Sequence, residues 1–253
     1  MSPLLRALSA ETLKLRGTLA LWLCLIAPAT VVGLYVLQVS FSKFSGRAPP
    51  DPAQAWFVFS QSIMVLWCFL MLPLFVTLQS ALLAGLEHGE NQWKHLLALP
   101  VPRRVHYLAK ALALVAMVLA AFAVLALLIP LGGWLLMYVQ PAFGLGGMPP
   151  WGRMAETAAA SFAASMLIVS LQTWIAIRWR SFTVAVAVGM TATVMGFLIG
   201  QSARFGHWYP WSMPAHVLSA KAEHLEFVVL AGLIGGLLVT ALGLADYLRR
   251  EIS

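Results

Sequence analysis

The residues of this chain whose type and spacing come closest to a chemical site are three histidines in one short segment. His207, His216 and His224 follow one another at spacings of nine and eight residues. Imidazole binds zinc well, but zinc ligands usually come in tighter pairs along the chain. Aromatic residues surround His207, which is typical of a belt at a membrane–water interface. We therefore predict no metal site in this segment.

The other reactive residue types give little support to catalysis. Asp51 and Asp246 are far apart in the sequence, whereas acid–base catalysis needs groups held within hydrogen-bond reach. Cys24 and Cys68 lie inside apolar stretches, which predicts small buried side chains rather than a disulfide framework. The chain contains no Gly-x-x-x-x-Gly-Lys-Ser/Thr phosphate loop, the motif that cradles nucleotide phosphates. We expect a protein that is not an enzyme and that binds no cofactor itself.

The elements that position these residues are set by where the charges fall. Only 25 of 253 residues are charged (16 basic and 9 acidic), and 61% are hydrophobic. The charges bracket six uncharged stretches, each long enough to cross about 30 Å of hydrocarbon as a helix. This predicts an all-α polytopic membrane protein, a single permease domain over 1–253. The expected spans are roughly 18–39, 56–84, 109–131, 155–177, 182–200 and 226–247.

The basic residues predict the orientation of these spans. With six spans both termini share one side, and that side holds 11 of the 16 Lys and Arg residues. Since cytoplasmic loops carry the excess of positive charge, both termini are expected in the cytoplasm. The net charge of +7 is dispersed among the spans, so nucleic acid is not an expected partner.

Outside the spans, residues 1–16 alternate leucines with charged residues at near-helical spacing. This pattern predicts an amphipathic helix lying at the inner leaflet. The alternative is a merely positive leader that sets the topology. Either way, membrane lipid is an expected partner.

Small residues at four-residue spacing predict close helix packing. Gly196 and Gly200 form one pair, and Gly232 and Gly236 form another. Such residues let helix backbones approach each other in lipid, where no hydrophobic force draws helices together. The polar residues within the spans favour helix packing over a substrate path, although both remain open; they are Gln61, Gln79, Gln172 and Thr173.

The segment before the last span is a second candidate for function. Trp208, Tyr209, Pro210 and Trp211 stand together at 208–211. Prolines at 210 and 214 interrupt any full span, so this segment is expected to be re-entrant or interfacial. We expect it to act as an outer gate.

The longest loop on the predicted cytoplasmic side runs over 85–107. Glu87 and Glu90 begin a predicted short helix, where acids complement the positive end of the dipole. Trp93 and Leu97, with Leu96, form an apolar face at helical spacing. Pro100 and Pro102 then stop the helix. The result is an amphipathic cytoplasmic helix suited to receive a push from a soluble partner.

This loop carries a resemblance to a known family. The run Glu87-His88-Gly89-Glu90-Asn91-Gln92-Trp93-Lys94-His95-Leu96-Leu97-Ala98-Leu99-Pro100 resembles the acid-rich, Trp-Lys-centred loop of ATP-binding cassette (ABC) permeases of the type-2 exporter class. Its nearest branch is the lantibiotic-immunity and bacitracin-resistance type. Weaker similarities cover the leader at 11–17, Tyr107-x-x-Lys110, and the run at 209–214.

The resemblance implies a mechanism and partners. In that family the loop is a coupling helix seated on a separate ATPase subunit, so Glu87, Glu90, Trp93, Lys94 and Leu97 become candidate ATPase-coupling residues. Trp93 and Lys94 could alternatively be ordinary interfacial anchors. ATP and Mg would be bound by two partner ATPase subunits. A second permease chain, identical or homologous, would complete a dimer.

We therefore expect the transmembrane permease subunit of an ATP-driven exporter in the inner (plasma) membrane. Its branch implies antibiotic resistance, with an amphipathic peptide antibiotic or lipid-like cargo. One alternative is a non-transporting anchor or sensor scaffold that recruits a soluble partner. A secondary transporter is disfavoured because the span interiors hold no acidic or basic residue, which proton- or sodium-driven carriers usually need.

Overall fold

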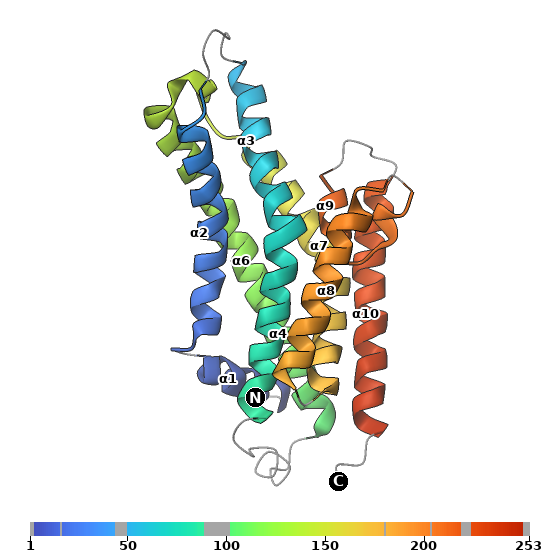
Figure 1. Cartoon of the computed structure of the whole chain (residues 1–253). Coiled ribbons are helices and arrows are strands. Elements are labelled where there is room, and N and C mark those ends of the chain that lie inside the picture. Colours follow the sequence, from blue (N-terminus) through green and yellow to red (C-terminus); the bar gives the residue numbers. More distant parts are fainter. Residues whose placement is uncertain are drawn as a thin grey trace.

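The computed structural model describes residues 3–15, 17–43, 50–88, 102–179, 181–202, 204–218 and 224–249. These residues form helices joined by turns (Figure 1). Six helices are long and apolar enough to cross a membrane, which confirms an all-α polytopic membrane protein. The elements are α1 Pro3–Leu15, α2 Leu19–Ser40, α3 Pro52–Leu66, η1 Trp67–Met71, α4 Leu72–His88, α6 Arg103–Val139, η2 Pro141–Phe143, α7 Trp151–Arg178, α8 Phe182–Gly200, η3 Gly206–Trp208, α9 Met213–His216 and α10 Leu225–Arg249.

Several helices extend further than the uncharged stretches predict. The second span runs continuously through α3, η1 and α4, and α6 has 37 residues, or about 55 Å at 1.5 Å per residue. That length exceeds the about 30 Å of hydrocarbon. Residues 85–88 and 103–107 are helical, so α4 and α6 reach into both ends of the predicted coupling loop 85–107. Charged residues mark where the lipid-embedded part of a helix ends. They do not mark where the helix itself ends, because a helix can continue into water.

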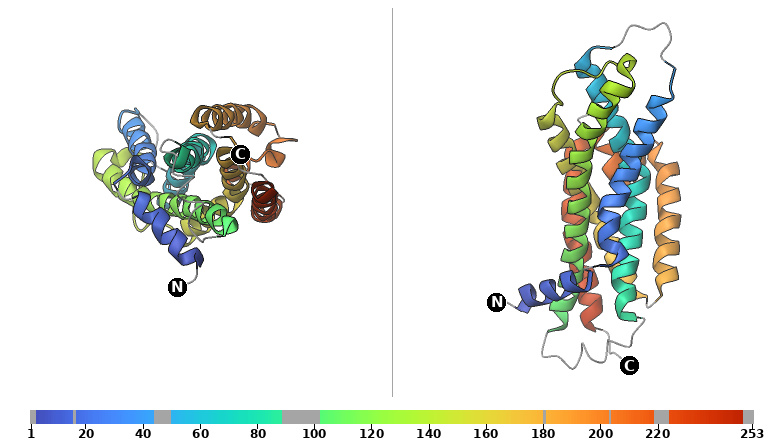
Figure 2. Two further views of the ribbon diagram at one scale, coloured as in Figure 1. Left: turned by 90° about the horizontal axis from the view of Figure 1, so that it is seen from below. Right: turned by 90° about the vertical axis from the view of Figure 1, so that its left-hand side faces the viewer.

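Helix α1 lies across the foot of the bundle rather than along it (Figure 2). It packs against α6, with Glu11 buried and paired to Lys14 at 3.0 Å. Leu5 and Leu13 remain more than half exposed, as expected of a helix that also meets a lipid surface. Gly17 has a φ of 75°, so the left-handed conformation that glycine tolerates turns the chain from α1 into α2.

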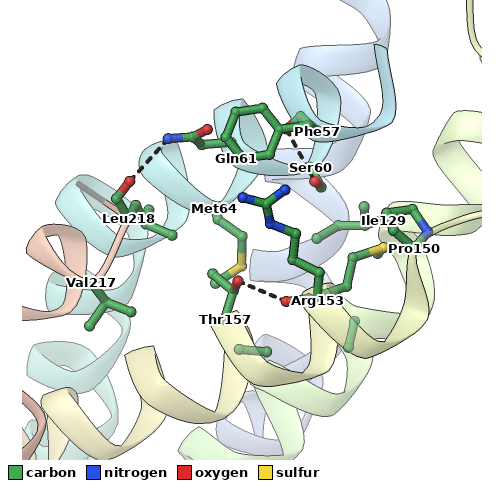
Figure 3. A pocket seen from close by; sticks show the side chains of 13 residues that line it. Phe57, Ser60, Gln61, Met64, Ile129, Pro150, Arg153, Thr157, Val217 and Leu218 are labelled. Carbon is green, nitrogen blue, oxygen red and sulfur yellow. Dashed lines mark hydrogen bonds between the residues drawn. The ribbon is translucent and has the colours of Figure 1, made fainter. Parts of the chain in front are cut away.

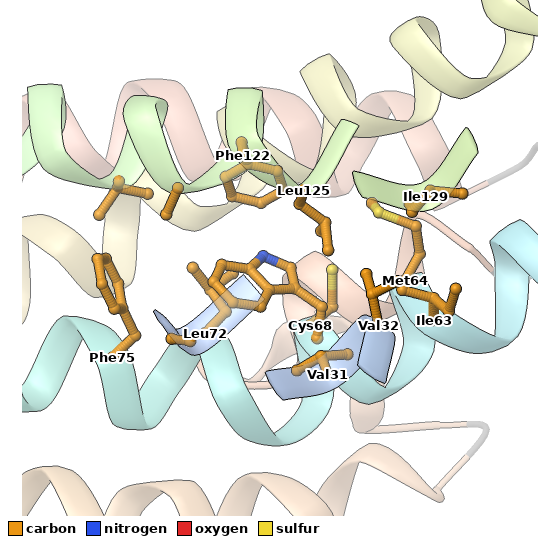
Figure 4. Close-up of a cluster of buried hydrophobic side chains, with 14 of the residues drawn as sticks. Val31, Val32, Ile63, Met64, Cys68, Leu72, Phe75, Phe122, Leu125 and Ile129 are labelled. Carbon is orange, nitrogen blue, oxygen red and sulfur yellow. The ribbon is translucent and has the colours of Figure 1, made fainter. Parts of the chain in front are cut away.

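The core lies where α2, the second span, α6 and α7 meet (Figure 4). Trp67 is fully buried there, and its ring lies edge-on to Phe122 at 5.9 Å. The helices α8 and α10 are the least buried spans and flank this core. Helix α10 packs on α7, and α8 packs on α4.

The second span contains a π-helical turn at Trp67–Met71. The N–H of Leu72 bonds to the carbonyl of Trp67, five residues back. Pro73 follows directly and has no N–H to give to the α-helical ladder. The wider turn therefore accommodates a proline that would otherwise interrupt the helix close to its centre.

The contact between α10 and α7 depends on two of the predicted packing glycines. A Cβ added to Gly232 would lie 2.5 Å from the Ala164 Cα, and one on Gly236 would lie 2.9 Å from the Met166 backbone. Backbone atoms cannot move aside for an added Cβ as the end of a flexible side chain can. The α10 backbone thus lies directly on that of α7 along this row.

Alanine substitutions on α10 test this contact. Gly232→Ala is expected to push α10 from α7 and destabilise the protein by about 1–3 kcal/mol. Gly235→Ala is the matched control, since its Cβ would meet only the Leu167 side chain, at 3.3 Å. The control should be neutral or slightly stabilising, because alanine has the better helix propensity. Thermal unfolding in detergent checks both, and equal losses would contradict the packing argument.

Candidate functional site

Two regions at opposite ends of the bundle are candidates for function. Helix α1, the last turns of α4 and α10 and the first turns of α6 lie at one end, called here the termini end (Figure 1). The other end, called the far end, carries the first turns of α3 and α7 together with η3 and α9. The predicted coupling loop belongs to the termini end, and the predicted gate to the far end.

At the termini end, a buried lysine fastens the two helices that lead into the predicted coupling loop. The Lys110 Nζ on α6 donates to the Leu83 carbonyl on α4 at 3.2 Å, and Lys110 is only 6% exposed. A cation near the C-terminal turns of a helix also meets the negative end of its dipole. Lys110 therefore holds α4 and α6 together at the termini end.

Helices α7 and α10 are joined at the same end by a polar cluster. The Trp174 indole N–H donates to Asp246 Oδ2 at 3.0 Å, and the Arg178 Nε lies 3.8 Å from the same oxygen. The Tyr107 hydroxyl of α6 packs against Gly243. These contacts link three spans into one unit at the foot of the bundle.

The predicted coupling residues fall at the border of the described structure. The backbone of Glu87 lies in the last turn of α4. Its side chain, together with Glu90, Trp93, Lys94 and Leu97, lies outside the residues that the structure describes. The structure thus defines the two helices that hold the loop, whereas the roles of these residues stay predictions.

At the far end, the chain between α8 and α10 folds back against the bundle. The Tyr209 hydroxyl donates to the Ala192 carbonyl at 3.0 Å, two turns inside α8. Trp211 is buried and packs on Gly196, while Ser212 and Phe69 pack on Gly200. These two glycines therefore contact the segment 209–212 and η1. Trp208 is 60% exposed and Pro210 half-buried, and a gating role for this segment stays a prediction.

The three histidines also meet at the far end. The rings of His207 and His224 stack at 4.3 Å with an interplanar angle of 4°, and His216 lies edge-on to His207 at 6.5 Å. Stacked rings direct their nitrogen lone pairs in parallel planes instead of toward one point. Among the described residues, no group of three His, Cys, Asp or Glu side chains is placed to hold a metal ion.

Folding changes the pKa of His216. Burial lowers its pKa from the usual 6.5, the hydrogen bond of its Nε2 to the Gly200 carbonyl at 3.1 Å opposes that shift, and the nearby His207 and His224 add to it. The folded protein therefore favours the neutral ring.

Acidification should consequently destabilise the far end. The contribution of His216 to the free energy of unfolding is fully present above pH 6.5. It falls as the pH drops from 6.5 toward the lowered folded pKa of His216, because the unfolded chain then binds more protons. We expect the melting temperature of the wild type to fall more between pH 7.5 and 5.5 than that of His216→Gln. Fluorescence-detected unfolding measures both. The same fall in both proteins would assign the pH dependence to other groups.

A cavity also lies in the far half of the bundle (Figure 3). It has a volume of about 260 Å³ and lies between α3, α6, α7 and the turn after α9. The Arg153 guanidinium points into it over the ring of Phe57, with 4.5 Å from Cζ to the ring centroid. The Gln61 amide crosses its rim and donates to the Leu218 carbonyl at 3.0 Å.

Two of the other predicted polar residues of the spans join neighbouring helices, and the third bonds within its own helix. Gln79 donates to the Ala20 carbonyl at 2.7 Å, and Gln172 donates to the Thr77 hydroxyl at 2.8 Å. Thr173 bonds to the Val169 carbonyl of its own helix. Packing thus accounts for these three, whereas Gln61 lines the cavity. Arg153 was missed as a site residue because an arginine at a helix end has the same sequence signature as an interfacial anchor.

Comparison with known proteins identifies one family. The model of a family described as ABC-2 family transporter protein matches residues 7–196. The match covers the chain from the middle of α1 into the last turns of α8, including both helices that hold the predicted coupling loop. No curated protein and no solved structure matches the chain.

Proposed function

We propose that this chain, which belongs to the ABC-2 transporter family, is the permease subunit of an exporter driven by ATP hydrolysis on separate subunits. Family membership identifies a transport permease that spans the membrane several times and normally works with ATPase partners. The proposal adds the direction of transport, the assembly and the coupling site. It places two ATPases and a second permease chain, identical or homologous, beside this one in the inner membrane.

One observation supports the coupling site above all. At the termini end, the hydrogen bond from Lys110 on α6 to the Leu83 carbonyl joins α6 to α4. The two helices that flank the predicted coupling loop are therefore fixed to each other. A force applied to that loop would reach two spans together. The packing of Tyr107 on Gly243 would pass it from α6 to α10, and the contacts of Asp246 with Trp174 and Arg178 would pass it on to α7.

The charge distribution supports an external energy source. Lys110 is the eighth residue of α6, and no acidic or basic residue follows it in that helix. Arg153 and Asp246 lie near the ends of α7 and α10. A carrier driven by protons or sodium usually has an ionisable group at mid-membrane depth, which makes an ATPase partner the better-supported source.

The proposed cargo is an amphipathic peptide antibiotic or a lipid-like molecule, in line with the resemblance of the loop to the lantibiotic-immunity and bacitracin-resistance branch. A protein that only anchors or senses a partner would need no cavity in its far half. The cavity beside Arg153 therefore favours transport over the scaffold alternative.

The proposed orientation can be tested by cysteine labelling in intact cells. Both native cysteines are buried and should stay unlabelled by a membrane-impermeant maleimide. Gln54→Cys, exposed at the far end, should label from outside, whereas Arg249→Cys, exposed at the termini end, should label only after lysis. The reverse pattern would place the coupling loop outside the cell and end the proposal.

The coupling role predicts a selective loss of activity. Trp93→Ala should reduce permease-stimulated ATP hydrolysis about tenfold or more, because buried tryptophans often dominate the energy of an interface. Glu87→Ala should weaken it less. The assay uses the complex co-purified with a phosphate-loop ATPase, which is to be sought first in the neighbouring reading frame.

A matched control separates coupling from a general surface effect. Trp179→Ala removes an exposed tryptophan of the termini end, directly after α7, and should leave assembly and ATP hydrolysis unchanged. If Trp93→Ala and Glu87→Ala also assemble and hydrolyse ATP normally, the loop is not the coupling element.

A further inference from the structure

The cavity in the far half of the bundle has one charged residue and otherwise polar or apolar walls. Within the part of the chain that the structure describes, Arg153 is the only charged residue that lines it. Its polar neighbours are Ser60 and Gln61 on α3 and Thr157 on α7 (Figure 3). The remaining wall is mostly hydrophobic and comes from α3, α6, α7 and the turn after α9: Phe57, Met64, Ala126, Ile129, Met154, Ala158, Val217 and Leu218.

The two hydroxyl donors of these polar neighbours and one of the two amide N–H groups of Gln61 are already engaged. The Ser60 hydroxyl donates to the Trp56 carbonyl and the Thr157 hydroxyl to the Arg153 carbonyl, each at 2.8 Å. The Gln61 amide donates to the Leu218 carbonyl. These groups can still accept hydrogen bonds, so an anion in the cavity must find most of its donors on Arg153.

The Arg153 side chain is held in a position that leaves its donors available. Its recorded contact among the described residues is the face of Phe57. A guanidinium lying over a ring gains cation–π stabilisation, while its N–H groups point outward in its own plane. That planar edge is suited to bind a phosphate or carboxylate through two parallel hydrogen bonds.

The position of Arg153 strengthens the site for an anion. It is the third residue of α7, in a first turn that has no side-chain cap. The positive end of the helix dipole therefore adds to the charge of the guanidinium. Glu156 lies one turn further on but does not line the cavity.

The size of the cavity limits what enters it. About 260 Å³ is slightly below the range of about 300–1,000 Å³ typical of small-molecule pockets. A whole peptide cannot be enclosed, whereas a compact headgroup with the first carbons of an apolar chain can. Met64, Ile129 and Met154 offer that chain a flexible apolar wall, since methionine adapts to irregular shapes.

From these observations we propose that the cavity binds an anionic amphiphile, with a phosphate or carboxylate headgroup on Arg153 and the adjoining chain along Met64, Ile129 and Met154. As a cargo site it rests on the proposed transport function. It narrows that function toward lipid-like cargo, because a basic peptide would meet a like charge at the headgroup position.

Binding can be measured on the purified full-length chain in neutral detergent, without an ATPase. Dioctanoyl phosphatidylglycerol and decanoate serve as anionic probes, with dioctanoyl phosphatidylcholine and inorganic phosphate for comparison, and native mass spectrometry counts the bound molecules. We expect one preferred anionic amphiphile per chain, bound about tenfold or more tightly than phosphatidylcholine. Inorganic phosphate alone should bind weakly, because it lacks the chain.

Matched variants separate the site from general surface charge. Arg153→Gln should weaken anionic binding about tenfold or more. Arg204→Gln is the control, since Arg204 also lies at the far end over an aromatic ring, that of Phe205 at 5.3 Å, but does not line the cavity. Ala158→Phe keeps the charge and fills the cavity, so it should also weaken binding. Unliganded melting temperatures establish that each variant folds.

The outcomes decide the proposal directly. Arg153-dependent binding of phosphatidylglycerol, decanoate or both supports it, and the pair tells which headgroup the site takes. Equal binding by Arg153→Gln, an equal loss in Arg204→Gln, or equal affinity for phosphatidylcholine or bare phosphate would overturn it. Since no ATPase is present, failure here leaves the coupling proposal standing, and failure of coupling leaves this site standing.

Discussion

The bilayer supplies no hydrogen-bond partners, and this constraint governs the whole molecule. Every backbone group at membrane depth must be satisfied within the chain, which leaves helices as the economical solution. Charged groups are costly there and gather at the helix ends. The cost of charge at membrane depth explains why the contacts of charged residues such as Lys110 and Asp246 lie at the foot of the bundle.

The sequence predicted the spans well because the same constraint determines both charge spacing and helix position. The six spans and the family assignment were recovered, and the start of α8 at Phe182 agrees to the residue. The ends of α4 and α6 were misplaced, because helices run on into water, where charge costs little. The cavity around Arg153 was not predicted, since it depends on how four distant segments pack.

The two ends of the bundle differ in structure. The termini end is tied by contacts between spans. The far end contains the cavity, the segment that folds back against α8 and the stacked rings of His207 and His224. Both ends are joined by the second span and α6, each long enough to reach beyond the membrane on its own.

The π-helical turn at Trp67–Met71 has the geometry of a helix that has gained one residue. A single extra residue rotates everything beyond it by about 100°, because an α-helix advances 3.6 residues per turn. In an uninterrupted α-helix, Gln61 and Gln79 would lie on the same face of the span. With the π-helical turn between them, Gln61 faces the cavity whereas Gln79 faces the Ala20 carbonyl. Converting that turn into regular α-helix would rotate the two halves of the span relative to each other about the helix axis.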